Sequence, residues 1–253
     1  MLHLHPFAFC LVLMVAVASP GESFASGGDL RGEDCRGAQT SETGAGTAGS
    51  LPSGAKLRRD PELETVRFLR GGNLSREIET EPYFRSLQAS NLFADLSLAF
   101  LGAYRDEFRL QRPEEEMVPV SVTEDDLGYK QVRLRQVYSG IPVYGAELMV
   151  QLNAASQVVL VQGKYIPTPV LLCTTPEITN ADALRVAGEN IHGTGSTCQN
   201  CEIELVIFGA DRDPPRLAYR IDATISLSQG WTVFVDAQSG AVLERLPTVY
   251  HSN

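Results

Sequence analysis

Few residues in this sequence have types and spacing that could support chemistry, and the clearest are two cysteines, Cys198 and Cys201. A Cys-x-x-Cys pair can form a disulfide, act as a redox centre or supply half of a zinc site. Redox pairs normally begin a helix that follows a strand, whereas this pair lies in a loop before an expected strand. Cys35 and Cys173 are too far apart in the sequence to form the second pair of a zinc site. We therefore expect a structural disulfide between Cys198 and Cys201 rather than a redox or metal site, with Cys173 as the main alternative partner.

The histidine and acidic residues form no recognisable catalytic or metal-binding pattern. Of the four histidines, only His192 and His251 follow the expected signal peptide. The sequence contains neither His-Glu-x-x-His, the signature of zinc proteases, nor Gly-x-Ser-x-Gly, the nucleophile elbow of hydrolases. The acidic run at 114–116 is typical of a solvated loop, and residues 124–126 lack the spaced ligands and central glycine of a calcium loop. We therefore expect no catalytic residue, no cofactor and no bound metal, and so not an enzyme.

The overall charge excludes several classes of partner. The chain has a net charge of -10. Nucleic acids and anionic membranes are also negatively charged, so neither should attract it. After the first residues, no apolar stretch approaches the length of about 20 residues that a membrane-spanning helix needs. We therefore expect no nucleic-acid partner and, once a signal peptide is removed, no membrane association.

The N-terminal residues resemble an export signal followed by a linker. Residues 7–18 are apolar but too short to span a bilayer, and small residues suited to signal cleavage precede Ser19 and Ser26. We expect a signal peptide over residues 1–25, with a buried N-terminal helix as the alternative, and hence a secreted or periplasmic protein. Residues 26–55 are rich in glycine, serine and threonine and are expected to be a disordered linker.

The region before the expected strands has mainly helical patterns. Residues 56–70 are mixed in composition and predict at most a short helix that docks weakly. From 81 to 110, large apolar side chains recur mainly every three or four residues, which places them on one face of a helix. Thr80 can cap its N-terminus, and Pro82 suits its first turn. Pro113 is expected to end this helix.

After this helix the apolar residues recur at every second position, as they do in β-strands. Val132 and Leu134 alternate with Arg133 and Arg135, which gives one apolar face and one charged face. An antiparallel sheet that is covered by a helix on one side requires this pattern. The expected strands are residues 118–123, 130–138, 143–152 and 157–165.

A smaller region then repeats the same organisation. A helix is expected from Thr179 or Asn180 to Ile191, because polar capping residues precede an apolar periodicity. The expected strands are residues 202–208, 217–225, 230–235 and 241–246. The sequence therefore predicts an α+β fold, with two cystatin-like helix-on-antiparallel-sheet modules in tandem.

The run from residue 126 to 148 resembles the signature of the N-terminal propeptides of secreted thermolysin-like and fungalysin-like zinc proteases. That signature reads D-x-x-G, followed by R-x-x-Q-x-Y-x-G-x-P-V-x-G. The matching residues are Asp126 (or Asp125), Gly128, Arg133, Gln136, Tyr138, Gly140, Pro142, Val143 and Gly145. Glycine and proline suit tight turns and strand entry, so Gly140, Pro142 and Gly145 are expected to maintain the fold. Arg133 and Gln136 have a second interpretation, as groups that face a partner.

The second region resembles the PepSY-type propeptide domain that normally follows this module in the family. Residues 217–221 and 231–243 look like its paired closing strands, and they include Trp231, Asp236 and Gly240. The resemblance implies the following division of the chain: signal peptide 1–25, linker 26–55, FTP-type module 56–168, PepSY-type module 169–247 and tail 248–253.

The resemblance also implies a function and a partner. In this family the propeptide acts as a chaperone for the catalytic domain and as an inhibitor that blocks its cleft until cleavage. The expected partner is therefore the catalytic domain of a thermolysin-like zinc metalloprotease. Two alternatives stay open: the truncated front part of such a protease, or a stand-alone secreted module that binds another protein.

Overall fold

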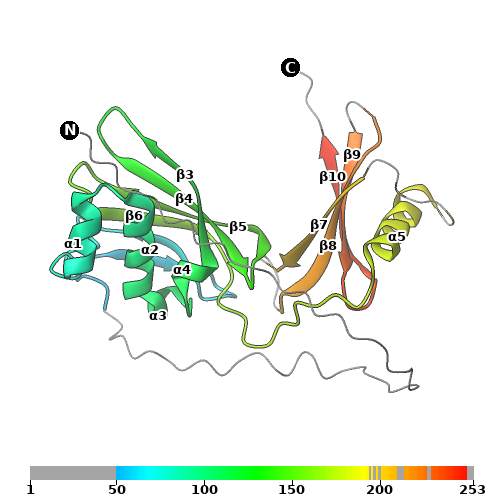
Figure 1. Ribbon diagram of the computed structural model, residues 1–253, viewed down its shortest axis with the longest axis horizontal. Helices are drawn as coiled ribbons and strands as arrows, with labels where there is room; N and C mark the ends of the chain where they lie inside the picture. The colour runs from blue at the N-terminus through cyan, green and yellow to red at the C-terminus, as the bar shows by residue number, and fades with distance from the viewer. Residues whose placement is uncertain are drawn as a thin grey trace, which may run out of the picture.

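The computed structural model describes residues 50–193, 195, 198, 201–209, 214–226 and 229–249. These residues form two β-sheets, each with helices on one face (Figure 1). The expected signal peptide, most of the expected linker and the end of the tail lie outside the described residues. The α+β class predicted from the sequence is confirmed, because the described part is mostly sheet with few helices.

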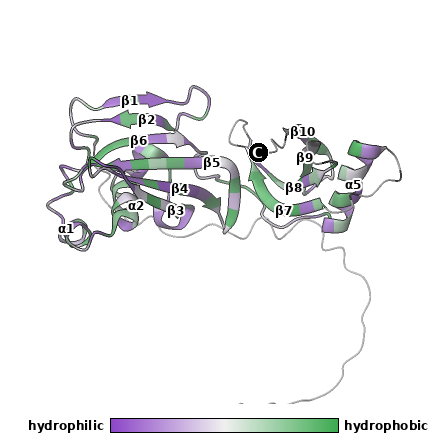
Figure 2. Cartoon of the chain, turned by 90° about the horizontal axis from the view of Figure 1, so that it is seen from above, coloured by the Kyte–Doolittle hydropathy of each residue, from purple (hydrophilic) through white to green (hydrophobic). Residues whose placement is uncertain are grey.

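The first sheet contains six antiparallel strands in the order β1-β2-β6-β5-β4-β3. Figure 2 shows four of these strands, β1, β2, β6 and β5, side by side from above. The last four strands lie close to the positions expected from the alternating pattern. The strands are β1 Lys56–Arg59, β2 Val66–Arg70, β3 Met117–Glu124, β4 Lys130–Tyr138, β5 Ile141–Leu152 and β6 Val158–Lys164.

The prediction of a helix within residues 56–70 is wrong, because β1 and β2 form a hairpin there. Asp60 shapes the connection, since its Oδ1 accepts hydrogen bonds from the backbone N–H groups of Glu62 and Leu63 at 3.0 and 2.9 Å. β2 also pairs with β6, and this long-range pairing stabilises a strand that local sequence does not indicate. All four residues of β1 are exposed, so the alternating pattern of a half-buried strand is absent.

Four short helices, rather than one long helix, cover one face of the first sheet. Asn91 and Arg109 have positive φ angles of 53° and 56°, and they lie where the helical path breaks. Thr80 does not cap the first helix: Glu81 occupies the N-cap position and no side chain bonds there, although Pro82 does lie in the first turn. Pro113 begins a helix instead of ending one. The helices are α1 Pro82–Ala89, α2 Phe93–Ala103, α3 Arg105–Phe108 and α4 Pro113–Glu116.

The second sheet has four consecutive antiparallel strands and one helix, α5 (Asn180–His192). Thr179 caps this helix as expected, through reciprocal hydrogen bonds with Asp182. The buried Ala183 and Ala187 place α5 against the apolar face of the sheet. The strands are β7 Cys201–Phe208, β8 Arg216–Thr224, β9 Gln229–Asp236 and β10 Val242–Val249.

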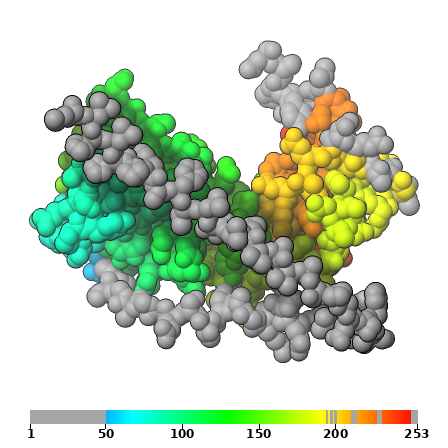
Figure 3. All heavy atoms as spheres, viewed as in Figure 1, coloured from blue at the N-terminus to red at the C-terminus, as the bar shows by residue number. Residues whose placement is uncertain are grey.

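The two sheets are connected by β5, whose Val143 pairs in parallel with Ile207 of β7. Buried residues of both parts belong to one continuous apolar core. In the space-filling view the green part of the chain and the yellow and orange part form two lobes (Figure 3). The division into two independent modules therefore stays a prediction, because hydrogen bonds and core packing cross the boundary. None of the helices in the described residues is long and apolar enough to cross a membrane.

Candidate functional site

The propeptide-like motif contains a tight turn between β4 and β5. Ser139 and Gly140 occupy the two turn positions with φ angles of 49° and 78°. Positive φ at both central residues defines a type I′ turn, whose twist matches that of an antiparallel pair. Tyr138 and Ile141 pair directly on either side of it. Gly140 therefore sets the point at which β5 starts.

Immediately after this turn, β5 leaves the regular ladder of the first sheet. Val137 pairs with Pro142 and Arg135 pairs with Glu147, so residues 143–146 of β5 face the single residue Gln136 on β4. Gly145 has a φ of 72° within this excursion, a conformation that favours glycine. The bulge brings Val143 to Ile207 of the second sheet. The segment Pro142–Gly145 thus acts as a joint between the sheets.

Aromatic side chains pack around this joint. The Tyr144 ring lies 4.7 Å from the ring of Phe234 and 6.2 Å from that of Phe208, measured between centroids. Phe208 and Phe234 stack on each other at 4.3 Å. The guanidinium of Arg220 lies over Tyr144 at 5.4 Å from its centroid, a favourable cation–π contact. Tyr144, which the sequence comparison with the motif did not single out, therefore fixes one sheet against the other.

Gln136 ties the chain that leaves β6 back to the first sheet. Its Nε2 donates to the carbonyl oxygen of Ile166 at 2.8 Å, and its Oε1 accepts from the Ile166 N–H at 2.9 Å. A second contact follows, in which the Thr168 hydroxyl donates to Glu116 at 2.5 Å. Gln136 is only 1% exposed. The interpretation of Gln136 as a partner-facing residue is therefore wrong, because its amide is fully engaged inside the fold.

The acidic start of the motif shapes a turn between β3 and β4. The Oδ1 of Asp125 accepts hydrogen bonds from the N–H groups of Leu127 and Tyr129 at 3.0 and 2.9 Å. Gly128 follows with a φ of 77°. Asp126 is exposed, so the residue that organises this turn is its neighbour Asp125.

Arg133 lies on the exposed side of β4, where a partner can reach it. Its Nη1 forms an ion pair with Glu147 at 2.8 Å, and more than half of its side chain is exposed. Exposed ion pairs contribute little to stability, typically below about 1 kcal/mol. The partner-facing interpretation of Arg133 is thus compatible with its position and stays a prediction.

In the second sheet, Asp236 organises the turn between β9 and β10. Its Oδ1 accepts from the N–H groups of Gln238 and Ser239 at 2.9 and 2.8 Å, and its Oδ2 pairs with Arg216 at 3.0 Å. Burial by itself raises the pKa of Asp236, but these hydrogen bonds and the Arg216 charge outweigh it and lower the pKa. Gly240 completes the turn with a φ of 74°.

Arg245, which stacks on Trp231, connects the last strand to α5. The guanidinium of Arg245 stacks 3.6 Å from the centroid of the Trp231 ring, and its Nη1 donates to the carbonyl oxygen of Asn190 at 3.0 Å. Because Asn190 lies in the last turn of α5, the bond satisfies a carbonyl that the helix itself leaves unpaired. β10 is therefore fastened to the helix as well as to β9.

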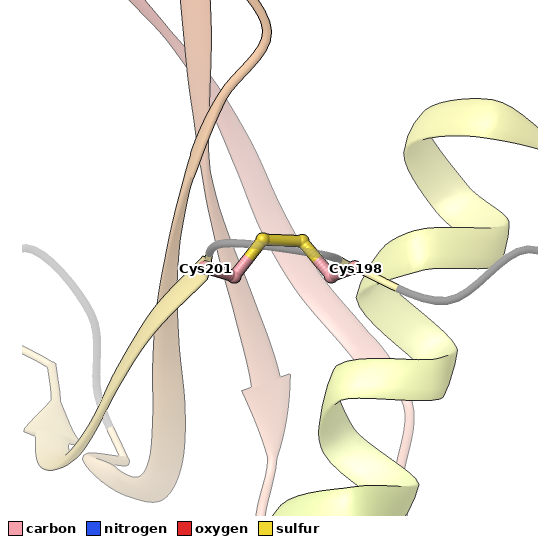
Figure 4. The surroundings of a disulfide bond; sticks show 2 residues. All are labelled: Cys198 and Cys201. Atoms are coloured by element: carbon pink, nitrogen blue, oxygen red, sulfur yellow. A yellow bond between two sulfur atoms is a disulfide. The ribbon is translucent and has the colours of Figure 1, made fainter.

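Cys198 and Cys201 are joined by a disulfide in the loop that leads from α5 into β7 (Figure 4). This pairing excludes Cys173 as a partner of either residue. Within the described ranges, no group of three or more His, Cys, Asp or Glu residues is arranged to hold a metal ion. The geometry is that of a staple on a connection, and it positions the start of β7 beside α5.

One further residue was missed by sequence reasoning. A Cβ atom at Gly163 of β6 would lie 2.1 Å from the carbonyl oxygen of Glu147 and 2.9 Å from the Cα of Leu148. Only glycine permits such close approach of the β5 and β6 backbones. A lone glycine inside an expected strand was the available signal.

The described residues therefore form a scaffold of two joined sheets, and comparison with known proteins shows what this scaffold resembles. The family model "Fungalysin/Thermolysin Propeptide Motif" matches residues 115–165, which contain β3 to β6 and the joint. The chain thus carries a propeptide motif of the fungalysin/thermolysin type.

Relatives of this chain include bacterial proteases. The chain is 28% identical to a bacillolysin of Brevibacillus brevis, over 62% of this chain and 32% of that protein. It is 27% identical to neutral protease B of Bacillus subtilis (strain 168), over 68% of this chain and 32% of that protein. A thermolysin of Alicyclobacillus acidocaldarius is 27% identical over 60% of this chain and 29% of that protein. The chain therefore spans about a third of the length of the curated relatives it matches.

Solved structures give weaker similarity. The C-terminal domain of YpeB from Bacillus megaterium aligns over 76% of this chain and 81% of that chain, with 14% identity and a TM-score of 0.33.

Proposed function

We propose that this chain is a secreted or periplasmic prosegment that assists folding of a thermolysin-like metalloprotease and inhibits it by blocking its cleft. The observation that carries the proposal is the propeptide motif at residues 115–165, together with relatives that include bacillolysins, a thermolysin and a neutral protease. The partner would be the catalytic domain, and the chain itself would contribute no catalytic group.

The geometry supports inhibition by occupancy. β5 and its aromatic cluster hold the two sheets in a fixed relation, and Arg245 holds β10 on α5. A rigid docking surface loses little conformational entropy when it binds. β10 continues to Val249, so the chain beyond it is the segment that could reach into the cleft of a bound catalytic domain.

Titration of the purified chain, residues 26–253, into thermolysin and neutral protease B tests this function. We expect residual protease activity to fall with inhibitor concentration, and the refolding yield of the denatured enzyme to rise. Removal of residues 250–253 should weaken inhibition more than removal of residues 26–49, because residues 250–253 directly follow β10 in the sequence. The proposal fails if the intact chain neither inhibits nor assists refolding of either protease.

A second candidate is the front part of a secreted zinc metalloprotease. The length of the relatives favours it, because the chain spans about a third of each. In this candidate the chain would dock on the catalytic domain in the same way, and the same gene would encode both. A His-Glu-x-x-His sequence encoded in frame after Asn253 would select this candidate. Co-purification of a partner that is not a protease would instead favour the third candidate, a stand-alone binding module.

A further inference from the structure

The face of the first sheet that carries no helix collects positive charge. Strand register places three rows of side chains on it, since directly paired residues of neighbouring strands share a face. We name it the basic face, after its six cations: Lys56, Arg58, Arg70, Arg133, Arg135 and Lys164. Glu147 is the single acidic residue in these rows on β1, β2, β6, β5 and β4. The face therefore carries a charge of about +5 in a chain whose net charge is -10.

Three of these cations are not neutralised by any of the described residues. Arg133 pairs with Glu147, and the guanidinium of Arg58 lies 4.9 Å from the centroid of the Phe68 ring. Lys56, Arg70 and Arg135 are exposed and have no ion-pair partner among the described residues. A face that served only solubility would mix both signs of charge. Segregation of one sign in an acidic chain instead indicates a surface that is matched to an acidic partner.

The apolar residues between the charges indicate the kind of partner. Phe68, Met149 and Leu160 are half-buried and lie in the same rows as the cations. Aromatic residues, methionine and arginine are the types enriched at protein–protein interfaces. The rows extend roughly 19 Å across five strands and about 14 Å along them, at ordinary strand spacing. These features favour a folded protein with an acidic surface over a flexible polyanion.

The position of the basic face indicates from which side the proposed protease would approach. In Figure 1, β10 runs toward the upper side of the molecule, and Figure 2 looks down on that side. No helix is drawn over β1, β2, β6 or β5 in Figure 2. A protein that receives the chain beyond β10 therefore approaches from the side where the basic face is open.

We infer that the basic face docks on an acidic surface of the catalytic domain while the chain beyond β10 enters its cleft. This inference rests on the proposed function and adds the surface that recognises the partner. Opposite charges across such an interface accelerate association and fix orientation, and their effect weakens as salt screens them.

Two double variants with the same change in charge test the inference. Arg70→Glu/Arg135→Glu reverses two unpaired cations on the basic face. Arg76→Glu/Arg85→Glu reverses two exposed arginines outside the rows, before and within α1, and serves as the control. Inhibition of thermolysin and neutral protease B would be measured with residues 26–253 at low and high salt. We expect the face variant to lose about tenfold or more in inhibition at low salt, with a smaller loss at high salt, and the control to change less than about twofold.

Several results would overturn the inference. If the two variants and the unmodified chain inhibit equally, the inference about the basic face is wrong. Inhibition by the unmodified chain would still support the proposed function. No inhibition by the unmodified chain overturns both. Loss of binding to heparin, or loss of self-association in sedimentation, with unchanged inhibition would assign the face to a polyanion or to a second copy. The milder variant Arg70→Gln/Arg135→Gln, checked by circular dichroism, should show a smaller loss in the same direction if the charge reversal disturbs folding.

Discussion

The two sheets bury similar apolar residues on their helix-covered faces, but the charged residues on their open faces are paired differently. Both bury apolar rows under helices, within one continuous core. On the open face of the second sheet, Arg220 forms ion pairs with Asp222 at 2.6 Å and with Glu204 at 3.5 Å. On the basic face of the first sheet, Arg70 and Arg135 have no such partner among the described residues. Arg220 of the second sheet is thus engaged in local structure, whereas Arg70 and Arg135 of the first sheet are available for binding.

The joint separates these two roles in space. Tyr144 extends from the first sheet into the aromatic cluster of the second, and Arg220 covers its ring. Arg220, the cation that covers Tyr144 at the joint, is paired with Asp222 and Glu204. We expect substitutions near the joint to reduce stability and substitutions on the basic face to reduce binding.

The largest expected effect comes from Tyr144→Ala. This change removes the ring that contacts Phe208 and Phe234, and we expect a loss of about 2–3 kcal/mol in the free energy of unfolding. Urea unfolding should also become less cooperative, because the sheets would be less tightly coupled. Tyr83→Ala is the matched control, since Tyr83 is 66% exposed. Equal unfolding curves for the two variants would show that the aromatic cluster does not join the sheets.

A smaller effect is expected from Arg220→Gln, which tests the comparison of charges directly. Replacement of Arg220 leaves Glu204 and Asp222 without their shared cation. We expect a loss of about 1–2 kcal/mol, since the pair is only partly exposed and each bond is charge-assisted. Arg135→Gln should change stability by less than about 0.5 kcal/mol. Thermal or urea unfolding of both variants measures the difference, and equal losses would remove the distinction between the two faces.

The strands from β3 to β10 could be predicted from the sequence because alternation and turn residues are local signals. β4 has the predicted limits, and its apolar and charged faces lie as expected. β1 and β2 could not be predicted in this way, because all of β1 is exposed and β2 depends on pairing with the distant β6. The prediction of one long helix was wrong because the apolar periodicity continues across Asn91, where the backbone adopts a left-handed conformation and the helix is interrupted.

The motif residues could be identified from the sequence, but their roles depend on contacts between distant segments. Gly140 lies in the expected tight turn. The function of Val143 as a link to Ile207, and the clamp of Gln136 on Ile166, depend on how the chain folds back. The basic face likewise becomes visible only in the register, since its cations come from four different strands.

The smallest effect concerns pH and the paired carboxylate of the second sheet, Asp236. Its pKa is lowered in the folded state, so its contribution to stability is fully present above the unfolded pKa of about 4 and is lost as the pH falls through the lower folded value. Asp236→Asn should therefore reduce stability at neutral pH and flatten the decline of unfolding free energy below about pH 4. Asp126→Asn removes an exposed carboxylate that forms no hydrogen bond among those described, and it serves as the control. Urea unfolding at a series of pH values measures both slopes. If the Asp236 variant keeps the full acid-dependent decline, then the turn between β9 and β10 does not depend on that charge, and the contrast between paired and unpaired charges would rest on Arg220 alone.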